Sequence, residues 1–186
     1  MNSRKHNVLE PANTVLVLVD IQGKLAEIMH ENEALVQNVR RLILGARALA
    51  IPIIWTEQIP EKMGPTIPGI QELLTSEHPI SKKSFSCCGE PRFTSTLKLT
   101  GKKQVLLAGI ETHVCVFQTS ADLIKQEFEV HVPADAVSSR TPANKQIGLD
   151  RINSIGAQIT SVESALFEML KTSEHTAFRD ILKIVK

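Results

Sequence analysis

The feature that most constrains the fold is a run of apolar residues that lacks a polar face. Thr14–Val19 reads TVLVLV, and Gln104–Ala108 repeats the pattern later in the chain. A surface strand alternates apolar and polar residues, whereas a central parallel strand is apolar on both faces because helices cover it above and below. Both runs are therefore predicted to be central strands of a parallel sheet.

The segments between such runs have helical periodicity. Ala34–Ala50 repeats Leu, Val and Ile at spacings of three and four, which predicts an amphipathic helix that ends before Pro52. We expect further extended segments at Ile53–Trp55, Pro79–Lys82, Glu129–Val132 and Gln158–Thr160, helices at Pro91–Leu99, Cys115–Gln126, Pro142–Ile155, Ser161–Lys171 and Glu174–Lys186, and a loop at Glu57–Gly69. This alternation predicts a three-layer α/β sandwich with a parallel sheet of about six strands. Residues 1–186 are expected to form one domain.

Composition argues against several function classes. Lys and Arg number 21 against 20 Asp and Glu, and aromatic residues make up 4% of the chain, so a nucleic-acid partner is not expected. The longest apolar runs are too short to cross a membrane. Met1–Pro11 has no apolar stretch of the kind a signal peptide needs. We therefore expect a cytoplasmic protein whose three cysteines are thiols.

Three residues with reactive side chains lie at or after the carboxyl ends of predicted strands. They are Asp20, Lys82 and, after Gly109-Ile110-Glu111-Thr112-His113-Val114, Cys115. Because ligands of open parallel sheets bind at the carboxyl ends of the strands, we expect the acid, the amine and the thiol to meet at one edge. Cys115 is predicted in the first turn of a helix, where the helix dipole favours a thiolate. Together they supply a base, a cation and a nucleophile.

Each of these residues also has a purely structural interpretation. An Asp at a strand end is commonly a turn former or a helix cap. A lone Lys is usually a solvated surface group, and a lone Cys in a helix usually packs as a small apolar residue. The chemical interpretation depends on the three occurring together.

Four segments give the chain a resemblance to the isochorismatase-like cysteine hydrolases. They read VLVDIQ at 17–22, PISKKSFS at 79–86, AGIETHVCV at 108–116 and PADAVSSR at 133–140. The resemblance implies a catalytic triad of Cys115, Asp20 and Lys82 on a six-stranded parallel sheet. It also implies a non-proline cis peptide bond between Ile110 and Glu111, with backbone N–H groups there and at Cys115 holding a substrate oxyanion. The implied reaction is cleavage of a small amide or related C–N compound through a thioester on Cys115.

Neighbouring residues leave choices open. Family spacing selects Lys82 rather than the adjacent Lys83. Possible pocket residues are Gln22, Trp55, Phe85, Cys87 and His113. Each of these residues could instead have a purely structural role, as a buried core side chain or as part of a turn. Glu57 could line the pocket or lie in solvent, and Asp135 and Arg140 are expected to cap a helix or form an ion pair near the site.

The sequence departs from two branches of the family. The metal ligands of nicotinamidases have no counterpart in Thr56–Lys62, so no metal or other cofactor is expected. Isochorismatases proper lack the cysteine. Two alternatives to an enzyme are a catalytically silent protein-binding module and a redox-responsive protein centred on Cys87 and Cys88. The expected partners are a small-molecule substrate and further copies of the chain in a homo-oligomer.

Overall fold

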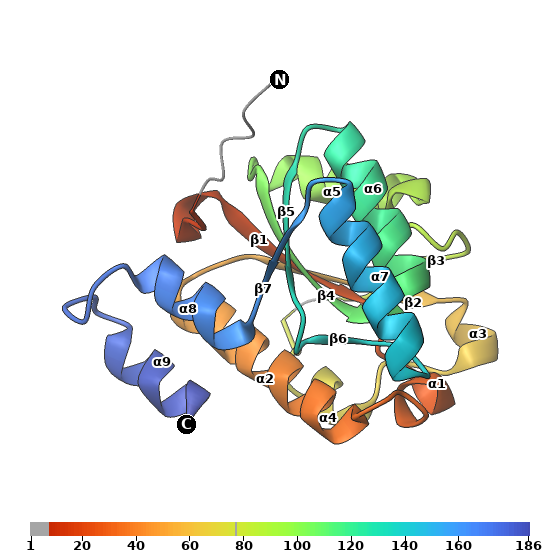
Figure 1. Ribbon diagram of the computed structural model, residues 1–186, viewed down its shortest axis with the longest axis horizontal. Coiled ribbons are helices and arrows are strands. Elements are labelled where there is room, and N and C mark those ends of the chain that lie inside the picture. Colours follow the sequence, from red (N-terminus) through yellow and green to blue (C-terminus); the bar gives the residue numbers. More distant parts are fainter. Residues whose placement is uncertain (1–7, 77) are drawn as a thin grey trace.

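A computed structural model describes residues 8–76 and 78–186, so most of the polar stretch at the start of the chain lies outside the described residues. Figure 1 shows a sheet between two layers of helices. The strands are β1 Thr14–Val19, β2 Ile53–Gln58, β3 Ile80–Lys82, β4 Gln104–Ile110, β5 Glu129–Pro133, β6 Val137–Ser138 and β7 Gln158–Thr160. The helices are α1 Gly23–Glu27, α2 Asn32–Ala48, α3 Pro60–Met63, α4 Pro68–Gln71, α5 Pro91–Leu99, α6 Phe117–Lys125, α7 Pro142–Ser154, α8 Val162–Leu170 and α9 Phe178–Val185.

The sheet is parallel throughout the described residues, in the order β3-β2-β1-β4-β5-β7, with the short β6 paired to β4. This confirms the predicted three-layer α/β sandwich; β6 is a strand that the sequence pattern did not indicate. The order reverses between β1 and β4, because β2 and β3 lie on one side of β1 and β5 and β7 lie beyond β4. A ligand site is expected where the carboxyl ends of β1 and β4 diverge.

Alternate residues of the apolar strands enter two separate cores. Leu16 and Leu18 of β1 pack with α2, α8 and α9, whereas Val15 and Val17 pack with α5, α6 and α7. Every residue of β1 and β4 is buried, as the continuous apolar runs predicted. Trp55 of β2 packs in the first core and not at the carboxyl edge of the sheet.

The segment from residue 57 to 69 differs from the expected loop. β2 continues to Gln58, and the short helices α3 and α4 follow. The expected helix at Cys115–Gln126 also begins differently: a π-helical turn at Thr112–Val116 precedes α6. Turns of this type widen the helix locally and frequently occur at functional sites. The structure therefore differs from the sequence-based elements mainly around the carboxyl edge of the sheet.

Candidate active site

The floor of the site is a buried ion pair between the ends of two strands. Asp20 directly follows β1 and Lys82 ends β3, and the two residues are 2% and 1% exposed. Lys82 Nζ donates to Asp20 Oδ2 across 2.6 Å. Thr56 Oγ1 donates to the other carboxylate oxygen, Oδ1, across 2.8 Å. Both oxygens of Asp20 therefore have a donor, and the carboxylate is held in one orientation.

Neutral oxygens complete the surroundings of the Lys82 ammonium. Gln58 Oε1 lies 2.7 Å from Nζ, and the backbone oxygens of Ser84 and Phe85 each lie 3.1 Å away. An ammonium has three hydrogens to donate, so four acceptors satisfy it fully. The neighbouring Lys83 side chain is exposed, and its backbone oxygen accepts from Gln58 Nε2. The structure thus brings Lys82, and not Lys83, to Asp20.

Cys115 reaches the same carboxylate from the π-helical turn. Its residue is 8% exposed, and its thiol lies close enough to Asp20 for the negative charge of the carboxylate to act on it. Burial, followed by the negative charge of Asp20, raises the pKa of the Cys115 thiol to about 12, although Lys82 opposes this. Burial and the adjacent carboxylate therefore oppose the thiolate that the position of Cys115 near a helix start was expected to favour.

Burial also raises the pKa of the Asp20 carboxyl above its usual value, against the effect of Lys82. A carboxylate with a raised pKa is a stronger proton acceptor than an exposed one. The resting site therefore holds a neutral thiol against a basic carboxylate. This arrangement can transfer the proton when the sulfur attacks an electrophile.

The peptide bond between Ile110 and Glu111 is cis. The sequence suggested that Glu111 acts through its backbone, but its side chain also forms part of the site. Glu111 Oε2 accepts from the backbone N–H and the Nε–H of Arg140, both across 3.1 Å. The Arg140 side chain is 55% exposed and that of Glu111 is 10% exposed. This second ion pair lies at the rim.

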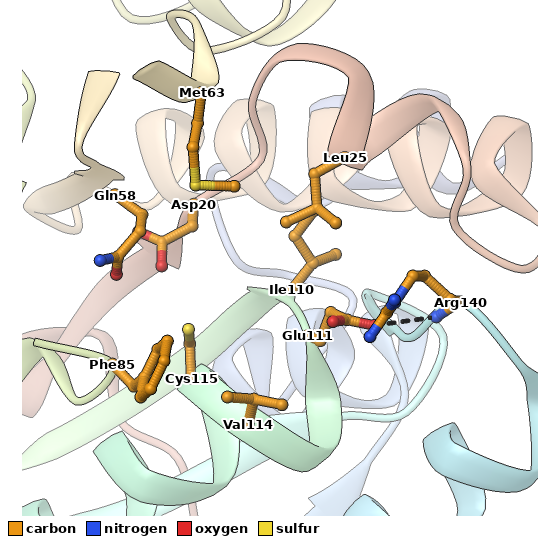
Figure 2. Close-up of a pocket in the computed structure, with 10 residues that line it drawn as sticks. All are labelled: Asp20, Leu25, Gln58, Met63, Phe85, Ile110, Glu111, Val114, Cys115 and Arg140. Carbon is orange, nitrogen blue, oxygen red and sulfur yellow. Dashed lines mark hydrogen bonds and ion pairs between the residues drawn. The ribbon is translucent and has the colours of Figure 1, made fainter. Parts of the chain in front are cut away.

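The cavity above Cys115 has a volume of about 230 Å³. Figure 2 shows its wall, formed by Asp20, Leu25, Gln58, Met63, Phe85, Ile110, Glu111, Val114, Cys115 and Arg140. The wall is therefore drawn from α1, α3 and the ends of several strands. Phe85, which the sequence placed in the pocket, is 56% exposed at this cavity.

Four other residues expected in the pocket are not part of this wall. Trp55 packs in the core, and Cys87 is fully buried behind Asp20, with its sulfur 3.6 Å from Thr56 Oγ1. His113 Nδ1 lies 3.0 Å from Ser139 Oγ. Gln22 is also fully buried. These four side chains contact the protein around the cavity and do not face the cavity itself.

Gln22 fixes the segment that forms one side of the cavity. Its Nε2 donates to the backbone oxygens of Gln58 and Gly64, and its Oε1 accepts from the Gln58 backbone. Gly23 allows a further close approach, since a Cβ there would lie 1.9 Å from the backbone oxygen of Met63. Backbone contacts thus join the start of α1 to the end of α3, and Leu25 and Met63 are positioned together.

Sequence reasoning missed Leu25, Gln58, Met63 and Val114 as wall residues. Only Gln58 and Val114 carried a signal, because Gln58 is close to the end of a predicted strand and Val114 adjoins Cys115. Glu57, which was left open, is 6% exposed and its Oε1 accepts from the backbone and hydroxyl of Thr66. It therefore holds the segment rather than lining the cavity.

The remaining cysteines are free thiols, of which Cys87 is buried and Cys88 is half-buried. Burial raises the pKa of Cys87 to about 11 and that of Cys88 to about 12. Unlike Cys115, neither of them lines the cavity, and neither was found paired in a disulfide, so a redox centre at Cys87 and Cys88 gains no support. Across residues 8–76 and 78–186, no group of three or more His, Cys, Asp or Glu side chains is arranged to hold a metal ion. No helix within these residues is long and apolar enough to span a membrane.

The chain matches known proteins over most of its length. The model of the Isochorismatase domain matches residues 14–164. The secreted isochorismatase effector Isc1 of Phytophthora sojae is 35% identical over 182 residues, covering 96% of this chain and 87% of Isc1.

Two solved structures share the fold closely. MAR1 ribonuclease from Caenorhabditis elegans superposes with a TM-score of 0.91 at 37% identity, over 96% of this chain and 92% of that one. YcaC from Pseudomonas aeruginosa, solved with hexane-2,5-diol and covalent acrylamide, also has a TM-score of 0.91, at 25% identity over 98% and 93% of the two chains.

Proposed function

Because this chain belongs to the isochorismatase family, and membership of that family supports a hydrolase function, we propose that it is a cysteine hydrolase that cleaves a small amide or related C–N bond. The observation that carries the proposal is the convergence of three side chains. Asp20 forms an ion pair with Lys82, its charge acts on the Cys115 thiol, and Asp20 and Cys115 face the same cavity. We propose these three residues as the catalytic residues.

In the first half of the reaction, Asp20 accepts the thiol proton as the Cys115 sulfur attacks the substrate carbonyl carbon. The tetrahedral oxyanion is held by backbone N–H groups of Glu111 and of the turn that carries Cys115. The C–N bond then breaks, the protonated Asp20 gives its proton to the leaving nitrogen, and a thioester forms on Cys115. Lys82 stabilises the negative charge that moves between sulfur and carboxylate.

In the second half, water attacks the thioester carbonyl and loses a proton to Asp20. The C–S bond breaks, the acid product leaves and Asp20 returns the proton to sulfur. The raised pKa of Asp20 suits this role, because the same group must accept and release a proton in each half. The neutral acceptors around Lys82 keep its charge solvated while the charge of Asp20 changes.

The test is hydrolysis of a panel of small amides, ureas and hydroxamates by the wild-type protein and by Cys115→Ala, Asp20→Asn and Lys82→Met. We expect each variant to lose at least about 1,000-fold in rate. Lys83→Met, which changes an exposed neighbour, is the matched control and should keep full activity. Mass spectrometry should detect an acyl adduct or an acrylamide adduct on Cys115. Turnover that survives Cys115→Ala would refute the proposal.

A ribonuclease function, for which the Caenorhabditis elegans relative is named, gains no support from the cavity, since the cation in its described wall, Arg140, is already paired with Glu111. We keep three further predictions as proposals: a single domain, a homo-oligomer and a cytoplasmic location. Limited proteolysis, sedimentation and cell fractionation, respectively, test them. Sedimentation as a monomer at micromolar concentration would exclude the oligomer.

A further inference from the structure

The cavity wall combines five apolar side chains with three charged ones, each of which belongs to an ion pair within the protein. Leu25, Met63, Phe85, Ile110 and Val114 supply the apolar part. They come from α1, α3, the segment after β3, the end of β4 and the π-helical turn, so apolar surface faces Cys115 from several directions. Figure 2 shows Met63 and Leu25 reaching into the cavity opposite the turn that carries Cys115.

The charged groups of the wall are already compensated by the protein. Asp20 is bonded to Lys82, and Glu111 accepts twice from Arg140. In Figure 2 the Glu111 carboxylate is directed toward Arg140 and away from Cys115. A substrate carboxylate in this cavity would meet two carboxylates and five apolar side chains, and the cation in the described wall, Arg140, is already paired through Nε with Glu111 at the rim.

The side-chain amide of Gln58 is also held by the protein. Its Oε1 accepts from Lys82, and its Nε2 donates to the Lys83 backbone oxygen. Gln58 is therefore fixed in orientation, and one N–H of its Nε2 remains for a single acceptor on the substrate. At about 230 Å³ the cavity is smaller than the roughly 300–1,000 Å³ of typical ligand pockets, so the substrate must be compact.

Building on the proposed function, we infer that the substrate is a compact, uncharged amide whose non-reacting part is aliphatic and packs against Met63 and Leu25. The reacting carbonyl lies over Cys115, and the aliphatic group lies under the side chains from α1 and α3. The apolar wall then contributes binding, while the compensated charges exclude charged analogues. Met63 and Leu25 are specificity-determining residues in this arrangement.

Three amides of equal heavy-atom count test the inference: 4-methylpentanamide, succinamate and 5-aminopentanamide. They share a primary amide and differ in carrying an isopropyl group, a carboxylate or an ammonium at the far end. We expect kcat/KM for 4-methylpentanamide to exceed both others by at least about 100-fold. Cys115→Ala gives the background rate. A preference for either charged amide would overturn the substrate class and leave the hydrolase intact.

Calorimetric binding of the same amides to Cys115→Ala keeps the inference testable without turnover. Tighter binding of the neutral amide supports the inference even if no Cys115-dependent hydrolysis is found, an outcome that would refute the proposed function alone. Equal or tighter binding of succinamate would refute the inference alone.

Substitutions at Met63 locate the selectivity. Met63→Lys adds a cation to the wall and should narrow the preference for the neutral amide over succinamate by at least about 10-fold. Met63→Leu keeps the wall apolar and should leave the preference unchanged. An unchanged preference in Met63→Lys would show that the substrate does not contact this side chain, and would overturn its assigned position.

Discussion

Two ion pairs border the same cavity, and they differ in almost everything except charge. The floor pair, Asp20 and Lys82, is 2.6 Å long and both side chains are buried. The rim pair, Glu111 and Arg140, is 3.1 Å long and its Arg side chain is 55% exposed. A buried pair is costly to disrupt because a lone charge remains in a poorly solvated place, whereas an exposed partner recovers water. Position in the cavity thus separates a pair suited to chemistry from one that shapes the entrance.

Breaking the floor pair should have the largest effect on stability. Lys82→Met leaves the Asp20 carboxylate buried beside Thr56 without its cation, and we expect the unfolding free energy to fall by about 3–5 kcal/mol. Urea denaturation measures it. The double variant Asp20→Asn/Lys82→Met removes both charges and should be more stable than Lys82→Met alone. A single-variant loss below about 1 kcal/mol would contradict the comparison.

Removing a neutral partner of the floor pair should have an intermediate effect. Gln58→Leu takes one acceptor from Lys82 and leaves the Lys83 backbone oxygen without its donor, so we expect a loss of about 1–3 kcal/mol. Gln118→Leu, an exposed glutamine on α6, is the matched control and should stay within about 0.5 kcal/mol of wild type. Equal losses of unfolding free energy in the two variants would mean that Gln58 does not stabilise the Lys82 ammonium.

The charge of Asp20 should also be visible in the reactivity of Cys115. Asp20 raises the pKa of the thiol and Lys82 lowers it, so Asp20→Asn should shift the alkylation midpoint down from about 12. A shift of one pH unit corresponds to about 1.4 kcal/mol. The rate of iodoacetamide labelling of Cys115 at fixed pH values between 7 and 11, followed by mass spectrometry, reports the change in the thiolate fraction.

Lys82→Met provides the opposite sign and should move the Cys115 midpoint upward. Burial remains the largest cause of the raised pKa in either variant. If both variants had the wild-type profile, the thiol would be insensitive to the floor pair, and the proposed proton transfer would lose its electrostatic basis.

Breaking the rim pair should have the smallest effect. Arg140→Ala exposes Glu111 to solvent that already reaches the pair, so we expect a loss of no more than about 1 kcal/mol. The loss should shrink further in high salt, because screening weakens exposed pairs. Denaturation at two salt concentrations measures both. A loss as large as that of Lys82→Met would remove the distinction between floor and rim.

The residues at the floor of the site could be predicted from the sequence for a simple physical reason. Residues that directly follow parallel strands collect at one sheet edge, so Asp20, Lys82 and Cys115 could be placed near one another before any coordinates were known. The two-core sandwich followed equally directly from strands that are apolar on both faces. These inferences depend on local patterns, which a sequence displays openly.

The residues of the cavity wall could not be predicted in the same way. Met63 lies in a segment that reads as a loop, and its position depends on the buried side chain of Gln22, forty-one residues earlier in the chain, which holds the backbone at Gly64. The effect of burial on the pKa of Cys115 was not predictable for a related reason, because helix position can be read from sequence but depth of burial cannot. Long-range packing determined both.

The close approach of Gly23 to Met63 has a consequence for how this protein can diversify. Any side chain at position 23 would collide with the Met63 carbonyl, so this junction can change little without being rebuilt. The side chains of Leu25 and Met63, by contrast, point into the cavity from that fixed backbone and can be exchanged without altering it. New substrate preferences, whether selected in nature or engineered, should therefore arise by exchanging these side chains on an unaltered frame.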